Sequence, residues 1–323
     1  MSAASAPPPA EANPNMAMPR ANGGNGARWL VLKAAVTFAL LAYLASKIDL
    51  VGLETKLRTL ALSPLALAAA IIMAEVPIVA FRWMVLARRT GAQMSYMLAL
   101  RLTFEGLFFG QVLPASIGGD VVRGWLGAGN GVALQPLIAS LILDRLIALL
   151  AAVMLIAAAL PWITATTLQM SAQISIVVVL VVLGGLFVDL LPLPAPLKNI
   201  RLVSTIRDLI SQTRRSLFSK SGAGAVLSSL AVHVMTIVAV TAIAASLGVG
   251  DVISASAIVV PVALVAAAMP VSVNGWGVRE GVMVAGFAVF GVAQTDAFLI
   301  SVLLGFSVVL SAMPGGLTWL NLR

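Results

Sequence analysis

Apolar runs long enough to cross a membrane alternate with short polar segments along most of this chain. A helix needs about 20 residues to cross the hydrocarbon core of a bilayer. Six runs reach that length: residues 29–48, 63–81, 134–160, 172–191, 223–247 and 297–320. A membrane β-barrel would instead show shorter segments in which apolar and polar residues alternate. The pattern therefore predicts an all-α, multi-pass membrane protein with six full transmembrane helices.

Two further apolar runs, 94–113 and 253–270, each lead into a polar, glycine-containing break, PASIGGDVVRG and PVSVNGWGVREG. Glycine lets the chain reverse and lets backbones approach closely. Irregular backbone at membrane depth is tolerated only where protein or a water-filled cavity satisfies its polar groups. We therefore expect two re-entrant helical hairpins that line a cavity. The backbone of their tips comprises Pro114, Gly118, Gly119, Pro270, Gly275 and Gly277.

Basic residues between the apolar runs set the expected orientation, because cytoplasmic loops are enriched in Lys and Arg. Arg82, Arg88 and Arg89 follow the second span, and segment 192–221 is the most basic part of the chain. Both segments face the cytoplasm only if run 94–113 enters and leaves the membrane on the same side. The N-terminus is then also cytoplasmic, and the second hairpin enters from the outer face.

The two breaks match each other without a gap at an offset of 156 residues. The pairs include Pro114 with Pro270, Ser116 with Ser272, Gly119 with Gly275 and Arg123 with Arg279. An odd number of crossings separates the breaks, which predicts an inverted repeat, a frequent plan of transporters that alternate access. The expected division is a disordered tail, 1–28, and one transmembrane domain, 29–323. Within that domain lie repeat 1 (29–160), loop 161–171, repeat 2 (172–320) and the basic loop 192–221.

Composition agrees with a membrane protein and excludes several functions. Hydrophobic residues make up 60% of the chain and charged residues 10%, against about 25% charged residues in soluble domains. The chain has no cysteine, which excludes disulfides, thiolate nucleophiles and Cys metal sites. The net charge of +8 lies mainly between the spans, where it favours contacts with anionic lipid headgroups over nucleic acid. The single His233 makes neither a metal site nor a catalytic triad, and we expect no metal and no cofactor.

Charged residues in or beside the apolar segments are the candidate substrate-binding residues. Each would cost about 2.5–3.5 kcal/mol at the centre of a membrane helix unless it were paired or hydrated, so they should face the protein interior. The candidates are Arg101, Glu105, Asp120, Arg123, Asp144, Arg145, Arg279 and Glu280, together with Ser116 and Asn274 at the hairpin tips.

Two interpretations of these charges follow from the sequence. In the first, Arg123 and Arg279 hold an anionic lipid headgroup in one cavity, because guanidinium groups bind phosphate oxygens with paired donors. Asp120, Asp144 and Glu280 would orient the arginines or carry coupling protons. In the second, all of these residues form structural ion pairs. Arg101 and Glu105 share a helix face at a spacing of four, whereas the adjacent Asp144 and Arg145 need separate partners.

Four stretches together resemble the lysylphosphatidylglycerol synthase transmembrane family: FRWMVLARR, FFGQVLPASIGGDVVRGW, LILDRLIALL and MPVSVNGWGVREG. The similarity covers nearly everything from Trp29 onward. In the best-known members this region precedes a cytoplasmic domain that transfers lysine from tRNA to phosphatidylglycerol, and it moves the product lipid between leaflets. Because the chain ends at Arg323, we expect no aminoacyl transfer. Gln111 stands where many relatives have asparagine, which bears on the fine substrate contacts.

The resemblance implies a non-enzymatic lipid flippase or lipid-headgroup transporter in the bacterial inner membrane. Its cargo would be a phospholipid, glycolipid, hopanoid or polyprenyl phosphate. One alternative is a non-transporting membrane partner of a lipid- or glycan-modifying enzyme, docked through the basic loop. The other is a membrane-embedded lipid transferase, for which Asp120 and Glu280 are the only plausible general bases.

Overall fold

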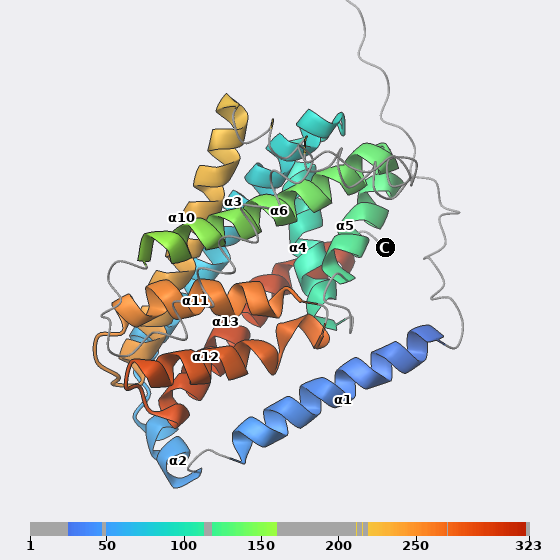
Figure 1. The fold of residues 1–323 in the computed structure, drawn as a ribbon. Helices are drawn as coiled ribbons and strands as arrows, with labels where there is room; N and C mark the ends of the chain where they lie inside the picture. Colours follow the sequence, from blue (N-terminus) through green and yellow to red (C-terminus); the bar gives the residue numbers. More distant parts are fainter. Residues whose placement is uncertain are drawn as a thin grey trace, which may run out of the picture.

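A computed structural model describes residues 25–46, 50–112, 118–159, 219–269 and 271–320, together with residues 211 and 215. This part of the chain contains helices and no strands (Figure 1). The elements are α1 (Asn25–Ala45), α2 (Leu50–Arg58), α3 (Leu62–Thr90), α4 (Tyr96–Val112), α5 (Gly118–Gly129), α6 (Leu134–Ala159), α10 (Lys220–Ser246), α11 (Ile253–Ala267), the short 3-10 helix η3 (Val273–Gly275), α12 (Val278–Val289) and α13 (Gln294–Leu320).

Within the described residues, four helices are long and apolar enough to cross a membrane: Leu62–Thr90, Leu134–Ala159, Gly222–Ser246 and Gln294–Leu320. They correspond to four of the six predicted spans. The predicted span 29–48 overlaps α1, whose apolar stretch, Val31–Ala45, is shorter than a full span. Outside the described residues lie the predicted span 172–191, residues 1–24 of the predicted disordered tail 1–28, and most of the basic loop 192–221. The last four residues of the predicted tail, 25–28, belong to α1 instead. The chain is thus a multi-pass helical membrane protein.

Helix α3 is longer than the sequence suggested. The apolar run was expected to end at residue 81 with Arg82 in a loop, but the helix continues to Thr90. Trp83 and Leu86 continue the apolar surface beyond Arg82, and both are fully buried. The helix ends at Gly91, whose φ of 93° lies in the left-handed region that glycine adopts without strain. The assignment of Arg82 to a cytoplasmic loop was therefore wrong.

Both broken apolar runs form pairs of antiparallel helices. In the first pair, α4 and α5, Gly106 and Gly110 face Gly119, and a Cβ on Gly119 would lie 2.5 Å from the Gly106 carbonyl oxygen. In the sequence, Gly119 belonged to the predicted hairpin tip, whereas Gly106 and Gly110 had no predicted role. In the second pair, α11 and α12, Gly286 packs against Val259. The structure thus gives both runs the shape of hairpins, whereas their re-entry on one face of the membrane stays a prediction.

The turn of the second hairpin needs glycine at two of the predicted tip positions. Gly275 has φ 78° and Gly277 has φ 85°. A Cβ on Gly275 would lie 2.6 Å from the Cβ of Ala267, so a larger residue would also clash with α11. Pro114 and Ser116 at the first tip and Pro270 at the second lie outside the described residues. Gly118 is buried at the start of α5.

The order and contacts of the helices follow the offset of 156 residues. The series α3, α4, α5, α6 is followed by α10, α11, α12, α13. Helix α3 packs on α10, α4 packs on α13, and α11 packs on α6 in the equivalent way. Each hairpin therefore lies against the last helix of the other repeat. The opposite orientation of the two repeats in the bilayer stays a prediction.

Two apolar clusters surround the region where the repeats meet. The larger includes Ile243, Val259, Phe287 and Ile300 from α10 to α13. The smaller includes Trp83, Leu102 and Leu137 from α3, α4 and α6. Helix α1 lies along the outer side of α12 (Figure 1) and also contacts η3, where the Val273 N–H donates to Thr37 Oγ1 at 2.9 Å. The bundle thus supports a polar centre with α1 at its periphery.

Candidate polar cavity

A small cavity of about 200 Å³ lies beside the first hairpin, where α3, α4, α5 and α6 meet. Five charged side chains contribute to its lining: Arg82, Asp120, Arg123, Asp144 and Arg145. Gln111 and Asn274 add amide groups. Three arginines and two aspartates give this group a net charge of +1. The cavity therefore combines enclosure with a modest positive charge.

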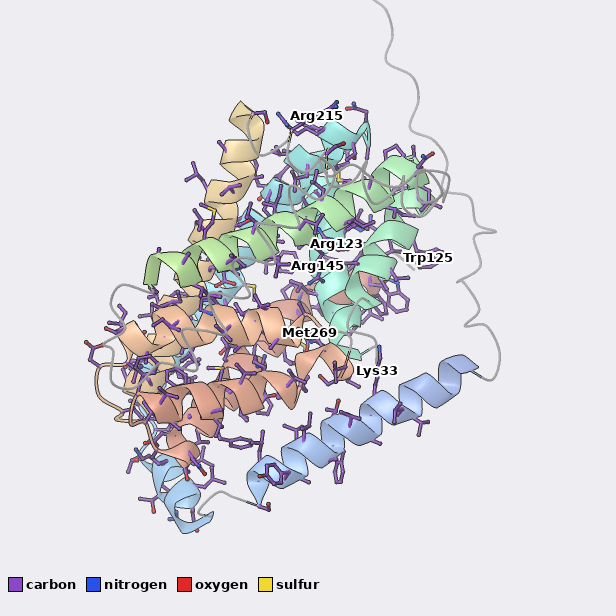
Figure 2. The ribbon with its side chains drawn as sticks, viewed as in Figure 1. Lys33, Arg123, Trp125, Arg145, Arg215 and Met269 are labelled. Carbon is purple, nitrogen blue, oxygen red and sulfur yellow. The ribbon has the colours of Figure 1, made fainter. Side chains whose placement is uncertain are left out.

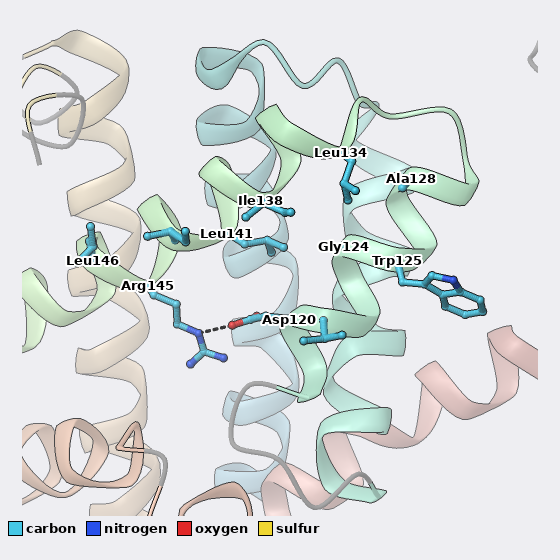
Figure 3. Close-up of a pocket in the computed structure, with 11 residues that line it drawn as sticks. Asp120, Gly124, Trp125, Ala128, Leu134, Ile138, Leu141, Arg145 and Leu146 are labelled. Carbon is cyan, nitrogen blue, oxygen red and sulfur yellow. Dashed lines mark hydrogen bonds and ion pairs between the residues drawn. The ribbon is translucent and has the colours of Figure 1, made fainter. Parts of the chain in front are cut away.

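The five charged residues form one chain of ion pairs. Arg82 Nε lies 2.8 Å from Asp144 Oδ1, and Arg123 Nη1 lies 3.8 Å from Asp144 Oδ2. Asp120 accepts from Arg123 Nη1 at 3.2 Å and from Arg145 Nε at 2.7 Å (Figure 3). The expectation that Asp144 and Arg145 have separate partners is confirmed. Figure 2 shows Arg123 and Arg145 close together beside α5 and α6.

The first hairpin holds Arg123 in place through small and aromatic neighbours. Asp120 occupies the first turn of α5, and Arg123 follows three residues later on the same face. The aliphatic part of Arg123 lies against Gly106, where a Cβ would come within 2.5 Å of Arg123 Cγ. Its guanidinium carbon lies 3.9 Å from the centre of the Trp83 ring, a cation–π contact. Gly106 and Trp83 thus hold the side chain of Arg123, which is one of the candidate residues identified from the sequence.

Arg123 has hydrogen-bonding capacity that the described residues leave unused. Its Nε and Nη2 atoms are buried and have no hydrogen-bond partner within the described part of the chain. Buried polar groups are nearly always paired, because an unpaired donor costs about 1–3 kcal/mol. Two such atoms on one guanidinium match the two oxygens of a phosphate or carboxylate. The arrangement is suited to binding an anionic group.

Arg82 is a member of the site that sequence reasoning missed. It is buried, and besides Asp144 it donates from Nη1 to Ser229 Oγ of α10 at 2.9 Å. It therefore links α3 to both α6 and α10. The signal was present in the sequence, because Arg82 follows an apolar run and precedes another apolar helical turn. Arg82 was missed as a site residue because it was grouped with Arg88 and Arg89 as evidence for a cytoplasmic loop.

Arg279, the equivalent arginine of the second hairpin, has different contacts from Arg123. Arg279 donates to Glu280 Oε1 from Nε at 3.0 Å and from Nη2 at 2.5 Å. Glu280 Oε2 accepts from the Gly277 N–H at 2.5 Å, and Ser301 Oγ also donates to Glu280 at 3.2 Å. Neither Arg279 nor Glu280 belongs to the lining of the polar cavity. The expectation that Arg123 and Arg279 share one cavity is not met, because Glu280 holds Arg279 against α12 and α13.

The two hairpins contact each other through side-chain amides and not through their arginines. Asn274 Nδ2 donates to Gln111 Oε1 at 2.9 Å, which joins η3 to the end of α4. Asn274 has φ 47° and is the only non-glycine residue with a positive φ among the described residues. Such a conformation is uncommon and asparagine tolerates it better than most residues. The predicted site residue Asn274 therefore does line the cavity, with a partner that the sequence did not identify.

The remaining predicted residues form a separate pair. Arg101 Nε lies 2.9 Å from Glu105 Oε1, as expected for residues four apart on one face. Glu105 is fully buried, yet neither residue lines the polar cavity. Within the described residues, no group of three or more His, Cys, Asp or Glu is placed to hold a metal ion. The polar cavity is therefore the candidate functional site.

Comparison with known proteins identifies one family. The model of the family described as the lysylphosphatidylglycerol synthase TM region matches residues 30–316, which include most of α1, most of α13 and every described element between them. No curated protein and no solved structure matches the chain.

Proposed function

This chain belongs to the lysylphosphatidylglycerol synthase transmembrane-region family, and on that premise we propose that it moves a polar or anionic lipid between membrane leaflets. The lipid headgroup passes through the polar cavity while its hydrocarbon chains stay in an apolar environment. The proposal includes the two hairpins as re-entrant elements of an inverted repeat. It also includes a location in the bacterial inner membrane with a cytoplasmic N-terminus.

One observation carries this proposal: Arg123 lies buried in a cavity of net positive charge, and two of its nitrogens have no partner among the described residues. Ionisable residues inside membrane domains are costly, and they commonly mark substrate or ion pathways. A phosphodiester carries a single negative charge, which would neutralise the cavity. Binding there would replace part of the hydration that a headgroup loses when it leaves water.

The position of the cavity supports movement as well as binding. It lies where the tip of one hairpin meets the other through Gln111 and Asn274. Substrate sites of repeat-based transporters are found at the interface between repeats, near broken helices. Relative movement of the two hairpins would then expose the cavity to one side of the membrane at a time.

The alternative of a lipid transferase has less support. A general base needs a carboxylate oxygen that is free to take a proton from a substrate. Both oxygens of Asp120 accept from arginines, and both oxygens of Glu280 accept hydrogen bonds from neighbouring groups. We therefore propose transport without enzymatic activity.

Reconstitution into vesicles tests the proposal. The full chain is inserted into liposomes that contain a fluorescent phosphatidylglycerol, and a membrane-impermeant quencher reports how fast the lipid changes leaflet. We expect the wild-type chain to accelerate exchange and Arg123→Ala to return it close to the protein-free rate. Arg58→Ala is the matched control, because the Arg58 side chain is exposed and its one ion pair among the described residues is with Glu54.

Circular dichroism and size-exclusion chromatography establish that each variant is folded. Wild-type rates equal to those of empty liposomes, across anionic, zwitterionic and glycosylated lipids, would contradict transport. Stable co-purification with a lipid- or glycan-modifying enzyme, without lipid movement, would favour the partner role instead.

A further inference from the structure

Two apolar grooves occupy equivalent places in the two repeats. The first groove lies between α5 and α6 and has a volume of about 640 Å³ (Figure 3). The second groove lies between α1, α12 and α13 and has a volume of about 510 Å³. Five lining positions correspond at the offset of 156 residues: Val121 and Gly277, Trp125 and Gly281, Ala128 and Val284, Ile138 and Gln294, Ile142 and Phe298. The grooves are therefore two copies of one feature of the fold.

The second groove shows what this surface accommodates. Leu40, Tyr43 and Leu44 of α1 form one wall of it. Helix α1 also fits closely against the hairpin turn, where a Cβ on Gly277 would lie 2.8 Å from Leu40 Cβ. Helix α1 therefore lies along the second groove. Within the described residues, no helix occupies the equivalent position on the first groove.

The two grooves differ in charge. Asp120 and Arg145 line the first groove and also line the polar cavity. Their ion pair, drawn in Figure 3, therefore lies at the boundary between the apolar groove and the polar cavity. The corresponding residues of the second repeat are Trp276 and Ser301, which carry no charge. Only the first groove thus adjoins a site for an anionic headgroup.

Within the part of the chain that the structure describes, the first groove is open on its outer side. Val121, Leu134 and Ile138 are about half exposed, at 52%, 52% and 46%. The Arg145 side chain is 55% exposed although its Nε is bound to Asp120. Apolar side chains that flank an arginine at the mouth of a polar cavity match a molecule with a hydrocarbon chain and a charged head.

We propose that the first groove holds a hydrocarbon chain of the lipid whose headgroup occupies the polar cavity. The inference rests on the proposed function and adds the place of the lipid chain. A chain gains no hydrophobic energy on leaving the bilayer for the groove, because both surroundings are apolar. The groove therefore positions the chain beside the headgroup, and recognition comes from the charged residues.

A chain-directed photoprobe tests the location. The full chain is reconstituted in phosphatidylglycerol vesicles that contain a trace of phosphatidylglycerol with a diazirine in one acyl chain. After irradiation, mass spectrometry maps the labelled residues. We expect labelling around Trp125, Ala128 and Ile138 to exceed that of exposed α10 residues such as Leu227 and Val234 by about fivefold or more. Equal labelling of both surfaces would overturn the inference.

Groove-filling variants test the function of the groove. Ala128→Trp places an indole in the first groove, and Val284→Trp makes the same kind of change at the equivalent position of the second groove. We expect Ala128→Trp to lower both photolabelling and lipid exchange by about fivefold or more, whereas Val284→Trp leaves both unchanged. Equal effects of the two variants, or no effect of either, would overturn the inference.

The absence of cysteine from the chain permits a test of the competing occupant. Ala128→Cys should react with a membrane-soluble thiol reagent, and saturating phosphatidylglycerol should protect it. Failure to react, combined with disulfide formation to a second cysteine placed within residues 172–191, would show that protein fills the groove and would overturn the inference.

The outcomes separate this inference from the proposed function. Lipid exchange that needs Arg123 but tolerates Ala128→Trp, with uniform labelling, would leave transport standing and remove the chain site. Labelling of the first groove that Ala128→Trp abolishes, without any lipid exchange, would establish the chain site and remove transport.

Discussion

Asn274 and Gln111, 163 positions apart in sequence, form a hydrogen bond of 2.9 Å that joins the turn of the second hairpin to the end of α4 in the first. Asn274 makes this contact from a backbone conformation that few residues adopt, with φ 47°. Strained residues persist where the surrounding structure holds them, and they often mark functional sites. Because both residues line the polar cavity, the bond connects the two repeats at the cavity wall.

Gln111→Leu is expected to remove this connection. The substitution keeps most of the side-chain volume but removes the acceptor, so Asn274 loses its partner. We expect a loss of about 1 kcal/mol in stability and a changed rate of lipid exchange, measured by thermal unfolding in detergent and by the vesicle assay. Gln135→Leu, at an exposed position of α6, is the control. Identical behaviour of the two variants would show that the tip contact has no role.

Arg82 and Asp144 should behave as a coupled buried pair. Removing one partner of such a pair costs about 3–5 kcal/mol, because the other charge stays buried and poorly compensated. After Arg82→Leu, Asp144 keeps only one ion pair among the described residues, with Arg123 at 3.8 Å. We expect Arg82→Leu with Asp144→Leu to cost clearly less than the sum of the single changes in a double-mutant cycle. Strict additivity would contradict direct coupling.

Substitution of Arg279 should mainly lower the stability of the protein, whereas substitution of Arg123 should mainly lower lipid binding. Arg279→Ala leaves Glu280 buried without its one charged partner among the described residues, which should cost about 3–5 kcal/mol. Arg123→Ala should cost less, because Asp120 keeps Arg145 and Asp144 keeps Arg82. Native mass spectrometry with phosphatidylglycerol should show at least about a tenfold loss of binding for Arg123→Ala, since a hydrogen bond to a charged group contributes about 1.5–3 kcal/mol. A variant at Arg279 that stays folded yet binds less lipid than Arg123→Ala would reverse the assignment.

Gly119 should be intolerant of even one methyl group. Its Cβ would lie 2.5 Å from the Gly106 carbonyl oxygen, so Gly119→Ala must push α5 away from α4. Overpacking of this kind costs about 1–3 kcal/mol. Gly129, in the same helix, has nothing within 4 Å of the equivalent position, and Gly129→Ala should leave thermal stability unchanged or slightly higher. Equal melting temperatures for the two variants would contradict the close contact.

The family and the general fold were predictable because their signals are local. A run of about 20 apolar residues predicts a spanning helix wherever it occurs, and four of the predicted spans have matching helices. The repeat was also visible, because Arg123 and Arg279 lie at the same offset as the glycines of the two breaks. The ends of helices were less certain, since Arg82 looks like a loop residue until the helix is seen to continue.

The sequence by itself determined that these charges must be paired inside the protein, because an unpaired charge in a membrane is costly. Only the tertiary structure decided which pairs form, because partners such as Arg82 and Asp144 lie on different helices and are 62 positions apart in sequence. The tertiary structure also gives the two equivalent arginines, Arg123 and Arg279, different hydrogen-bond partners. Glu280 Oε1 accepts from both Nε and Nη2 of Arg279, whereas Gly124, at the equivalent position after Arg123, offers no carboxylate. That difference leaves Arg123 with donors for a ligand, and it became visible only when the contacts of both guanidinium groups were known.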